Sequence, residues 1–158
     1  MDFDEIYNTY SQKIFRVCLG YFNDYDIARD MTQETFIAVW ESIGKFEQRS
    51  EISTWIYRIA TNKCLRQIQK NKNHLKTNFP ENLKQEEYNV EKDERLSLLQ
   101  KYISELPEIE RIMIALSLNG LPQEEIAEIT GSSHANCRVM LHRIKKKLMK
   151  KIEDDGRF

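Results

Sequence analysis

The sequence predicts an all-α protein with two small helical domains joined by a flexible linker, and three observations support this. Its 158 residues include only 5 Gly and 3 Pro, which favours long helices with short turns over a strand-rich fold. Apolar residues recur at three- and four-residue spacings, the period of an amphipathic helix. Residues 74–93 lose this period and are rich in Asn, Lys, Glu and Gln, which predicts a linker between domains at 1–73 and 94–153.

Three helices are expected in the N-terminal domain. Asn23-Asp24 should end the first helix and offer an N-cap for the second. Residues 45–52 are expected to form a loop, after which Ser53 or Thr54 caps the third helix. The predicted helices span about 3–22, 25–44 and 53–72.

Four helices are expected in the C-terminal domain. Asn119-Gly120 ends one of them, and Pro122 lies at the start of the next, where its missing N–H costs little. Ser132 or Ser133 should cap the last helix, which has apolar residues at steps of three and four. The predicted helices span about 94–106, 108–118, 122–130 and 133–152. The predicted buried stripe of the last helix is Cys137, Leu141, Ile144, Leu148 and Ile152.

A net charge of −1 conceals two strongly cationic segments. Residues 53–76 contain six Lys or Arg and no acid, and residues 132–152 contain seven and no acid. Two separate cationic segments in a short chain predict two contacts with a polyanion, most often nucleic acid. In the first segment Arg58, Asn62 and Arg66 share one polar stripe of a helix, which suits a phosphate backbone.

Residues 122–143 predict a helix-turn-helix, because a short helix, a glycine and a longer basic helix follow one another. Gly131 fits a turn position that requires positive φ. The second helix would enter the major groove, where Asn136 can bond adenine and Arg138 can bond guanine. An ordinary helical hairpin with a solvated basic face is the alternative. The side chains expected to contact phosphates are Arg143, Lys146 and Lys147.

The sequence contains no motif typical of an enzyme, such as a phosphate-binding glycine loop, a nucleophile triad or a metal cluster, and no cofactor is expected. Cys18, Cys64 and Cys137 lie far apart without CxxC spacing, so each is predicted to pack in the core. The longest apolar run, 112–116, is far shorter than the ~20 residues that span a bilayer. The acidic N-terminus does not resemble a signal peptide, so the cytoplasm is the expected location.

Several motifs, in the correct order, resemble the two conserved domains of a bacterial sigma factor. The short two-domain layout is similar to the extracytoplasmic-function group of the sigma-70 family, and the resemblance covers about 3–72 and 94–152. In the N-terminal domain it lies in Asp-Met-Thr-Gln-Glu-Thr-Phe at 30–36, Phe46 and Ser-Thr-Trp-Ile-Tyr-Arg-Ile-Ala-Thr-Asn at 53–62. In the C-terminal domain it lies in Leu106-Pro107, Gly-Leu-Pro-Gln-Glu-Glu-Ile-Ala at 120–127 and Leu-His-Arg at 141–143.

The resemblance implies a subunit that joins core RNA polymerase, recognises the −10 and −35 promoter elements and helps to open the duplex. Phe36 is expected in the core. Core packing also competes with strand contact at Trp55, which lies on an apolar stripe. The implied polymerase-binding residues are Asp30, Gln33, Glu34 and Ile37. The implied −10 residues are Trp55, Arg58, Asn62, Lys63 and Arg66. The implied −35 residues are His134, Asn136, Arg138, His142, Arg143 and Lys146.

The implied partners are core RNA polymerase, promoter DNA and an anti-sigma factor, which in this family is often membrane-bound. Relatives often carry a Gly-Thr pair and then a Ser-Arg pair early in the recognition helix, whereas this chain has Ala135-Asn136 and Val139-Met140. The −35 DNA sequence that relatives recognise is therefore not transferred to this chain. Two other function classes remain open from the residues. A stand-alone helix-turn-helix regulator would bind duplex DNA tightly without polymerase, and a helical enzyme acting on nucleic acid would show turnover.

Overall fold

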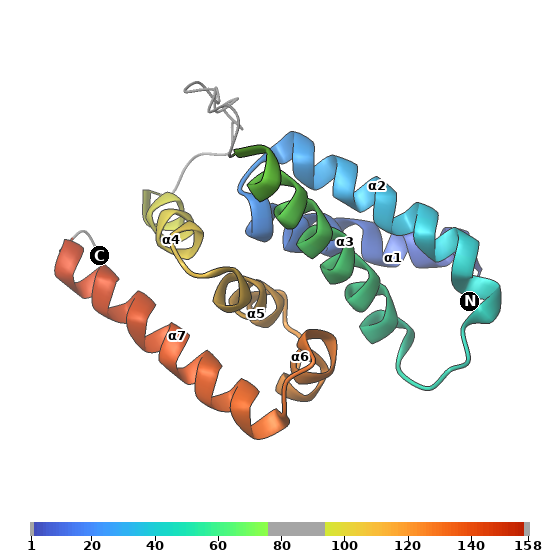
Figure 1. Ribbon diagram of the computed structural model, residues 1–158. Helices are drawn as coiled ribbons and strands as arrows, with labels where there is room; N and C mark the ends of the chain where they lie inside the picture. Colours follow the sequence, from blue (N-terminus) through green and yellow to red (C-terminus); the bar gives the residue numbers. More distant parts are fainter. Residues whose placement is uncertain (1, 76–93, 157–158) are drawn as a thin grey trace.

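The structure, a computed structural model, describes residues 2–75 and 94–156 (Figure 1). All regular structure in these ranges is helical, which confirms the predicted fold class. From residue 76 onward, the predicted linker lies outside the described residues. The elements are α1 (Phe3–Phe22), α2 (Tyr25–Ser42), a 3₁₀ turn η1 (Ile43–Lys45), α3 (Ile52–Leu75), α4 (Glu94–Ser104), α5 (Glu108–Leu118), α6 (Gln123–Thr130) and α7 (His134–Asp155).

The N-terminal helices pack as a bundle in which α1 lies against α2 and α3 contacts both. The turn between α1 and α2 forms as predicted. Asn23 adopts the left-handed conformation with φ 51°, and its N–H donates to the Leu19 carbonyl. The Asp24 carboxylate accepts from the Ile27 N–H at 3.0 Å and thereby caps α2. These local bonds reverse the chain and bring the apolar faces of α1 and α2 together.

The predicted cap of α3, Ser53 or Thr54, is wrong by two or three residues. The helix begins at Ile52, and the Trp55 N–H already donates to the Glu51 carbonyl at 3.1 Å. Ser53 and Thr54 therefore lie inside the first turn, where neither can act as the N-cap. Ile52 packs against the core, so tertiary contact extends the helix past the polar residues that would normally start it. At its other end α3 continues to Leu75.

The C-terminal helices form the predicted helix-turn-helix with two supporting helices. Gly131 ends α6 with φ 72°, as its turn position requires. The Ser133 hydroxyl accepts from the Asn136 N–H at 3.1 Å and caps α7. The apolar stripe of α7 faces inward as predicted. Its buried members are Cys137, Leu141, Ile144 and Leu148, and Ile152 is partly buried.

The two domains pack against each other, with α1 also contacting α4. Helix α1 lies against α5, and α3 lies against α6, so one apolar core runs through both domains. In Figure 1, α5 and α6 lie between the N-terminal bundle and α7, which forms the outer edge. At the α1–α5 contact a Cβ added to Gly20 would lie only 3.0 Å from the Ala115 Cβ. Glycine therefore permits this close approach of the two helices.

Candidate nucleic-acid interface

The outward face of α7 carries all six residues predicted to read the −35 element. Their side chains are all exposed, because the inward face of the same helix is fixed by its apolar stripe. Among the described residues, no carboxylate lies within ion-pair distance of Arg138, Arg143 or Lys146, whereas His134 lies 3.6 Å from Glu124. The face is therefore a broad cationic surface whose charges are available to an anionic ligand. Its six residues are His134, Asn136, Arg138, His142, Arg143 and Lys146.

Two other lysines of α7 point back toward the domain. The Lys147 ammonium donates to both carboxylate oxygens of Glu110 at 2.8 and 2.9 Å, and Lys151 donates to Glu105 at 2.8 Å. The bond from Lys151 lowers the pKa of the Glu105 carboxyl. Lys147 was expected to contact phosphate, but in this structure it fastens α7 to α5.

The five residues predicted for the −10 strand lie along α3, and the structure places them in three different settings. Asn62 and Arg66 are exposed. Trp55 is partly buried and packs against Phe46 with ring centroids 4.9 Å apart. The remaining two are held by carboxylates: Lys63 donates to Glu34 at 3.3 Å, and Arg58 donates to Glu128 at 2.8 Å.

The exposed face of α2 brings together the four residues predicted to contact polymerase. Asp30, Gln33, Glu34 and Ile37 are all exposed, and the Ile37 side chain is 56% exposed. Phe36 is 3% exposed, which confirms its predicted place in the core.

Trp40 is a residue of this face that the sequence reasoning missed. Its side chain is 63% exposed and packs edge-on against Phe3, with ring centroids 4.9 Å apart. Its spacing of three residues from Ile37 places the two side chains on neighbouring positions of the helix surface. This three-residue spacing from Ile37 was the signal in the sequence that could have placed Trp40 on the exposed face of α2. The α2 face is thus polar and acidic at one end and apolar at the other.

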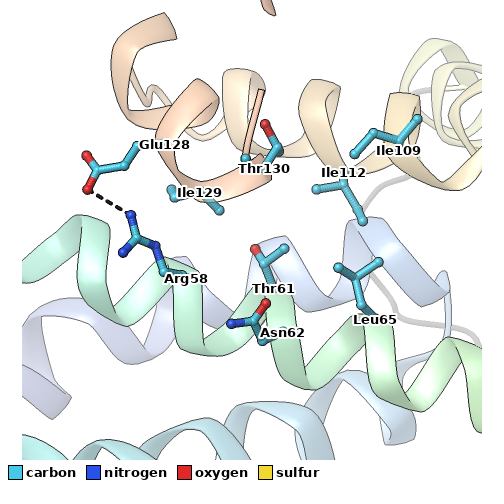
Figure 2. Close-up of a pocket in the computed structure, with 10 residues that line it drawn as sticks. Arg58, Thr61, Asn62, Leu65, Ile109, Ile112, Glu128, Ile129 and Thr130 are labelled. Carbon is cyan, nitrogen blue, oxygen red and sulfur yellow. Dashed lines mark hydrogen bonds and ion pairs between the residues drawn. The ribbon is translucent and has the colours of Figure 1, made fainter. Parts of the chain in front are cut away.

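A cavity of about 310 Å³ lies between α3 and the C-terminal domain, beside their contact (Figure 2). Arg58 and Asn62 line it from α3, while Glu128 and Ile129 line it from α6. In Figure 2 the Arg58 guanidinium and the Glu128 carboxylate reach across the space and form the ion pair. The cavity therefore lies beside two residues predicted to contact the −10 strand.

The cysteines lie in the core, as predicted. All three are buried and free of disulfides, and the Cys64 and Cys18 sulfurs are 3.6 Å apart. Within residues 2–75 and 94–156, no group of His, Cys, Asp and Glu side chains is arranged to hold a metal ion. No helix in the same ranges is long and apolar enough to cross a membrane.

Comparison with known proteins identifies both domains. The family model of sigma-70 region 2 matches residues 6–74, and that of sigma-70 region 4 matches residues 96–148. Among curated proteins, the chain is 28% identical over 156 residues to the ECF RNA polymerase sigma factor SigM of Bacillus subtilis, covering 94% of this chain and 93% of SigM. It is 29% identical over 167 residues to SigW of the same organism, covering 96% and 89%.

Solved structures share the whole fold. The sigma factor RpoE of Bartonella quintana, crystallised with the anti-sigma factor NepR, superposes with a TM-score of 0.83 at 20% identity, covering 96% of this chain and 97% of that one. CnrH in complex with the cytosolic domain of CnrY gives a TM-score of 0.72 at 18% identity, covering 97% and 88%. Both conserved regions are present in order, and the alignments to SigM and SigW extend over most of each relative. The chain therefore belongs to the sigma-70 family of RNA polymerase sigma factors, in its extracytoplasmic-function (ECF) group.

Proposed function

We propose that this sigma factor brings core RNA polymerase to its promoters through three separate helical faces. The exposed face of α2 contacts polymerase, α3 contacts the opened −10 strand, and the outward face of α7 reads the −35 duplex. The observation that carries this assignment is the exposure of all six predicted residues on α7, opposite an inward apolar stripe whose first four members are buried. The protein then acts by recognition, without catalysis of its own, in the cytoplasm where its polymerase works.

On α2, the composition of the face defines the partner it fits. Asp30 and Glu34 offer carboxylates, and Gln33 can both donate and accept. Ile37 and Trp40 add exposed apolar area that a partner would cover. A basic helical surface with an apolar strip would complement this face in both charge and shape. We assign this contact to core RNA polymerase.

On α3, the exposed Asn62 and Arg66 offer polar and cationic contacts to a single strand. The neighbouring Phe46–Trp55 pair adds an aromatic surface at the start of the helix. Binding of an opened strand combines cationic contacts to the backbone with stacking or pocket contacts to bases. This part of α3 supplies both kinds of group.

On α7, the side chains near the N-terminus are suited to base edges and those farther along to phosphates. Asn136 and Arg138 can make bidentate bonds to adenine and guanine. Arg143 and Lys146 lie about two turns later, where a recognition helix approaches the backbone. The Ser133 cap fixes the start of the helix and so the register of these groups.

We also propose an anti-sigma factor as a partner that controls this chain. The solved structure of the sigma factor RpoE, which shares this fold, contains the anti-sigma factor NepR. Such a partner could act by covering the α2 face or by holding the domains in one arrangement.

Transcription in vitro with core polymerase and a promoter library tests the proposed function. The purified chain is expected to support initiation from a subset of templates that share −10 and −35 sequences. A Gln33→Ala, Glu34→Ala double variant is expected to lose association with core polymerase in a pull-down. Gln12→Ala, on an exposed position of α1 outside the three faces, provides the matched control. Absence of any association between the wild-type chain and core polymerase would overturn the proposal.

A stand-alone regulator gives the opposite pattern of binding. It would bind duplex DNA tightly by itself, and core polymerase would add nothing. The sigma-70 region 2 match over residues 6–74 favours the polymerase subunit over that regulator, because it covers a domain that the regulator would not need. Electrophoretic mobility shifts with and without core polymerase distinguish the two patterns directly.

A further inference from the structure

The centre of the outward face of α7 is apolar, although most residues around it are polar or charged. Val139 lies two positions from Cys137 and two from Leu141, both of which are buried in the core. Because each residue turns an α-helix by about 100°, a position midway between two inward residues of this spacing points away from the core. The Val139 side chain is accordingly 43% exposed.

The helix surface around Val139 carries side chains that are proposed to contact DNA. Asn136 and His142 lie three positions away, and Ala135 and Arg143 lie four positions away, which are the spacings of neighbours on a helix surface. All of these residues are exposed. Ala135 adds a methyl group beside Val139, so the two residues form a small apolar patch. A DNA duplex held by the polar neighbours would meet this patch directly.

Valine at this position is not explained by the packing of the domain. Its side chain lies outside the apolar stripe that holds α7 in place, and a β-branched residue is a weaker helix former than Lys or Arg. A single exposed valine is ordinary on a protein surface, so its place on the helix decides its meaning. Met149, another exposed apolar side chain of α7, lies farther along the helix, beyond its first turns.

Thymine is the base whose major-groove edge fits an aliphatic side chain. It presents a C5-methyl group beside its O4 acceptor, whereas cytosine presents an amino group and no methyl group. Because rotation about its Cα–Cβ bond is restricted, valine holds its two methyl groups in nearly fixed positions and loses little freedom on contact. Val139 lies in the second turn of α7, and the first turns of a recognition helix are those that reach base edges.

We propose that Val139, with Ala135 beside it, is a specificity-determining residue that contacts the C5-methyl group of a thymine in the −35 element. This inference rests on the proposed function, because it requires the outward face of α7 to enter the major groove. Val139 then selects thymine over cytosine at one position, while hydrogen-bonding residues read the neighbouring base pairs. Asn136, one turn earlier, is suited to adenine, so neighbouring A·T pairs are expected in the promoters that this chain recognises.

Val139 and its charged neighbours contribute to binding in different ways. Arg143 and Lys146 would hold phosphates, and each such contact releases counterions, so their share of the affinity falls as salt rises. A contact between valine and a methyl group removes apolar area from water and releases no ions. Val139 therefore contributes to sequence preference without a contribution to the salt dependence. This difference separates a base contact by Val139 from an indirect effect on the charged residues.

Uracil in place of thymine tests the contact, because it removes only the C5-methyl group and keeps the pairing with adenine. The holoenzyme formed with the wild-type chain first selects its −35 element from a library of promoter duplexes. Each thymine of the selected element, on either strand, is then replaced by uracil, and the affinity of the holoenzyme is measured by competition. One replacement is expected to weaken binding about four-fold, the change that burial of one methyl group predicts.

Val139→Ala completes the test as a double-mutant cycle. The variant should bind the thymine duplex at least as weakly as the wild-type chain binds the uracil duplex, and uracil should then cause no further loss. The slope of its affinity against salt should equal that of the wild-type chain, and circular dichroism should show the same helical content. Met149→Ala, which shortens an exposed apolar side chain farther along α7, is the matched control and should keep the wild-type response to uracil.

The outcomes separate this inference from the proposed function. The inference is overturned by a selected −35 element without a thymine, by a wild-type chain that does not respond to uracil, or by an equal response in Val139→Ala. Each of these results leaves the proposed function intact, because the holoenzyme has still selected a promoter. A wild-type chain that selects no promoter with core polymerase would instead reject the proposed function.

Discussion

At the scale of single residues, neighbouring lysines of α7 have opposite surroundings. Lys146 faces solvent, whereas Lys147 is held by both carboxylate oxygens of Glu110. The sequence shows only a run of lysines, and helical spacing alone assigned both to phosphate. Which lysine is neutralised depends on where the acids of α5 lie, and this is fixed by the packing of α5 on α7. The structure therefore separates two residues that the sequence treats alike.

Lys146→Ala is expected to lower the salt dependence of promoter binding, because one fewer phosphate contact releases fewer counterions. The slope of log K against log salt should fall by ~1. Lys147→Ala should leave the slope unchanged, because its ammonium is already paired. Both slopes are measured with the holoenzyme on a −35 duplex. Equal slopes for wild type and Lys146→Ala would show that Lys146 makes no phosphate contact.

Arg138→Ala is expected to weaken recognition at one −35 position, by about 1–3 kcal/mol for a lost bidentate base contact. The side chain is exposed on the first turns of α7, where base edges come within reach. Competition binding against a set of promoters with single base changes measures the effect. A uniform loss across all promoters would instead identify Arg138 as a phosphate contact.

At the scale of helices, the sequence predicted most ends correctly because the signals are local. Asn23-Asp24 and Asn119-Gly120 each end a helix through bonds within a few residues. The start of α3 was misplaced because Ile52 is recruited into the helix by packing, which no local signal reveals. The exposure of Trp40 could not be predicted for a related reason: an apolar residue at helical spacing does not show whether another element covers it.

Ser133→Ala is expected to destabilise the C-terminal domain by about 0.5–2 kcal/mol, because the hydroxyl that accepts from the Asn136 N–H is lost. Ser53→Ala is the contrasting variant. Ser53 lies inside the first turn of α3, so Ser53→Ala should lower the free energy of unfolding by much less than the loss of an N-cap does. Urea unfolding monitored by circular dichroism measures both. If Ser53→Ala lowered the free energy of unfolding as much as Ser133→Ala does, α3 would begin where the sequence predicted.

At the scale of the whole molecule, the docking of the two domains could not be read from the sequence. It depends on a close approach between Gly20 and Ala115, which lie almost a hundred positions apart, and on an ion pair between Arg58 and Glu128. The sequence does predict which helices carry the promoter and polymerase residues. It does not predict that Arg58 of the −10 set pairs with Glu128 of the other domain, because that pairing arises from the shapes of both domains together.

High pH should destabilise the docked arrangement through Tyr57. Burial raises the pKa of this phenol to about 12, above the value of about 10 for an exposed tyrosine. The neutral phenol is favoured in the folded state, so the free energy of unfolding is unaffected below pH ~10 and falls as the pH rises toward 12. Tyr57→Phe should make this fall shallower in urea titrations at successive pH values. An identical pH dependence in both chains would show that Tyr57 ionises as freely as in solution.

The tight approach at Gly20 has a consequence for engineering. Leucine at this position would act as a wedge between α1 and α5. A Gly20→Leu chain should therefore loosen the docking of the two domains while every side chain assigned to DNA and to polymerase stays as it is. The smallest side chain of the protein thus sets how closely its two halves can lie.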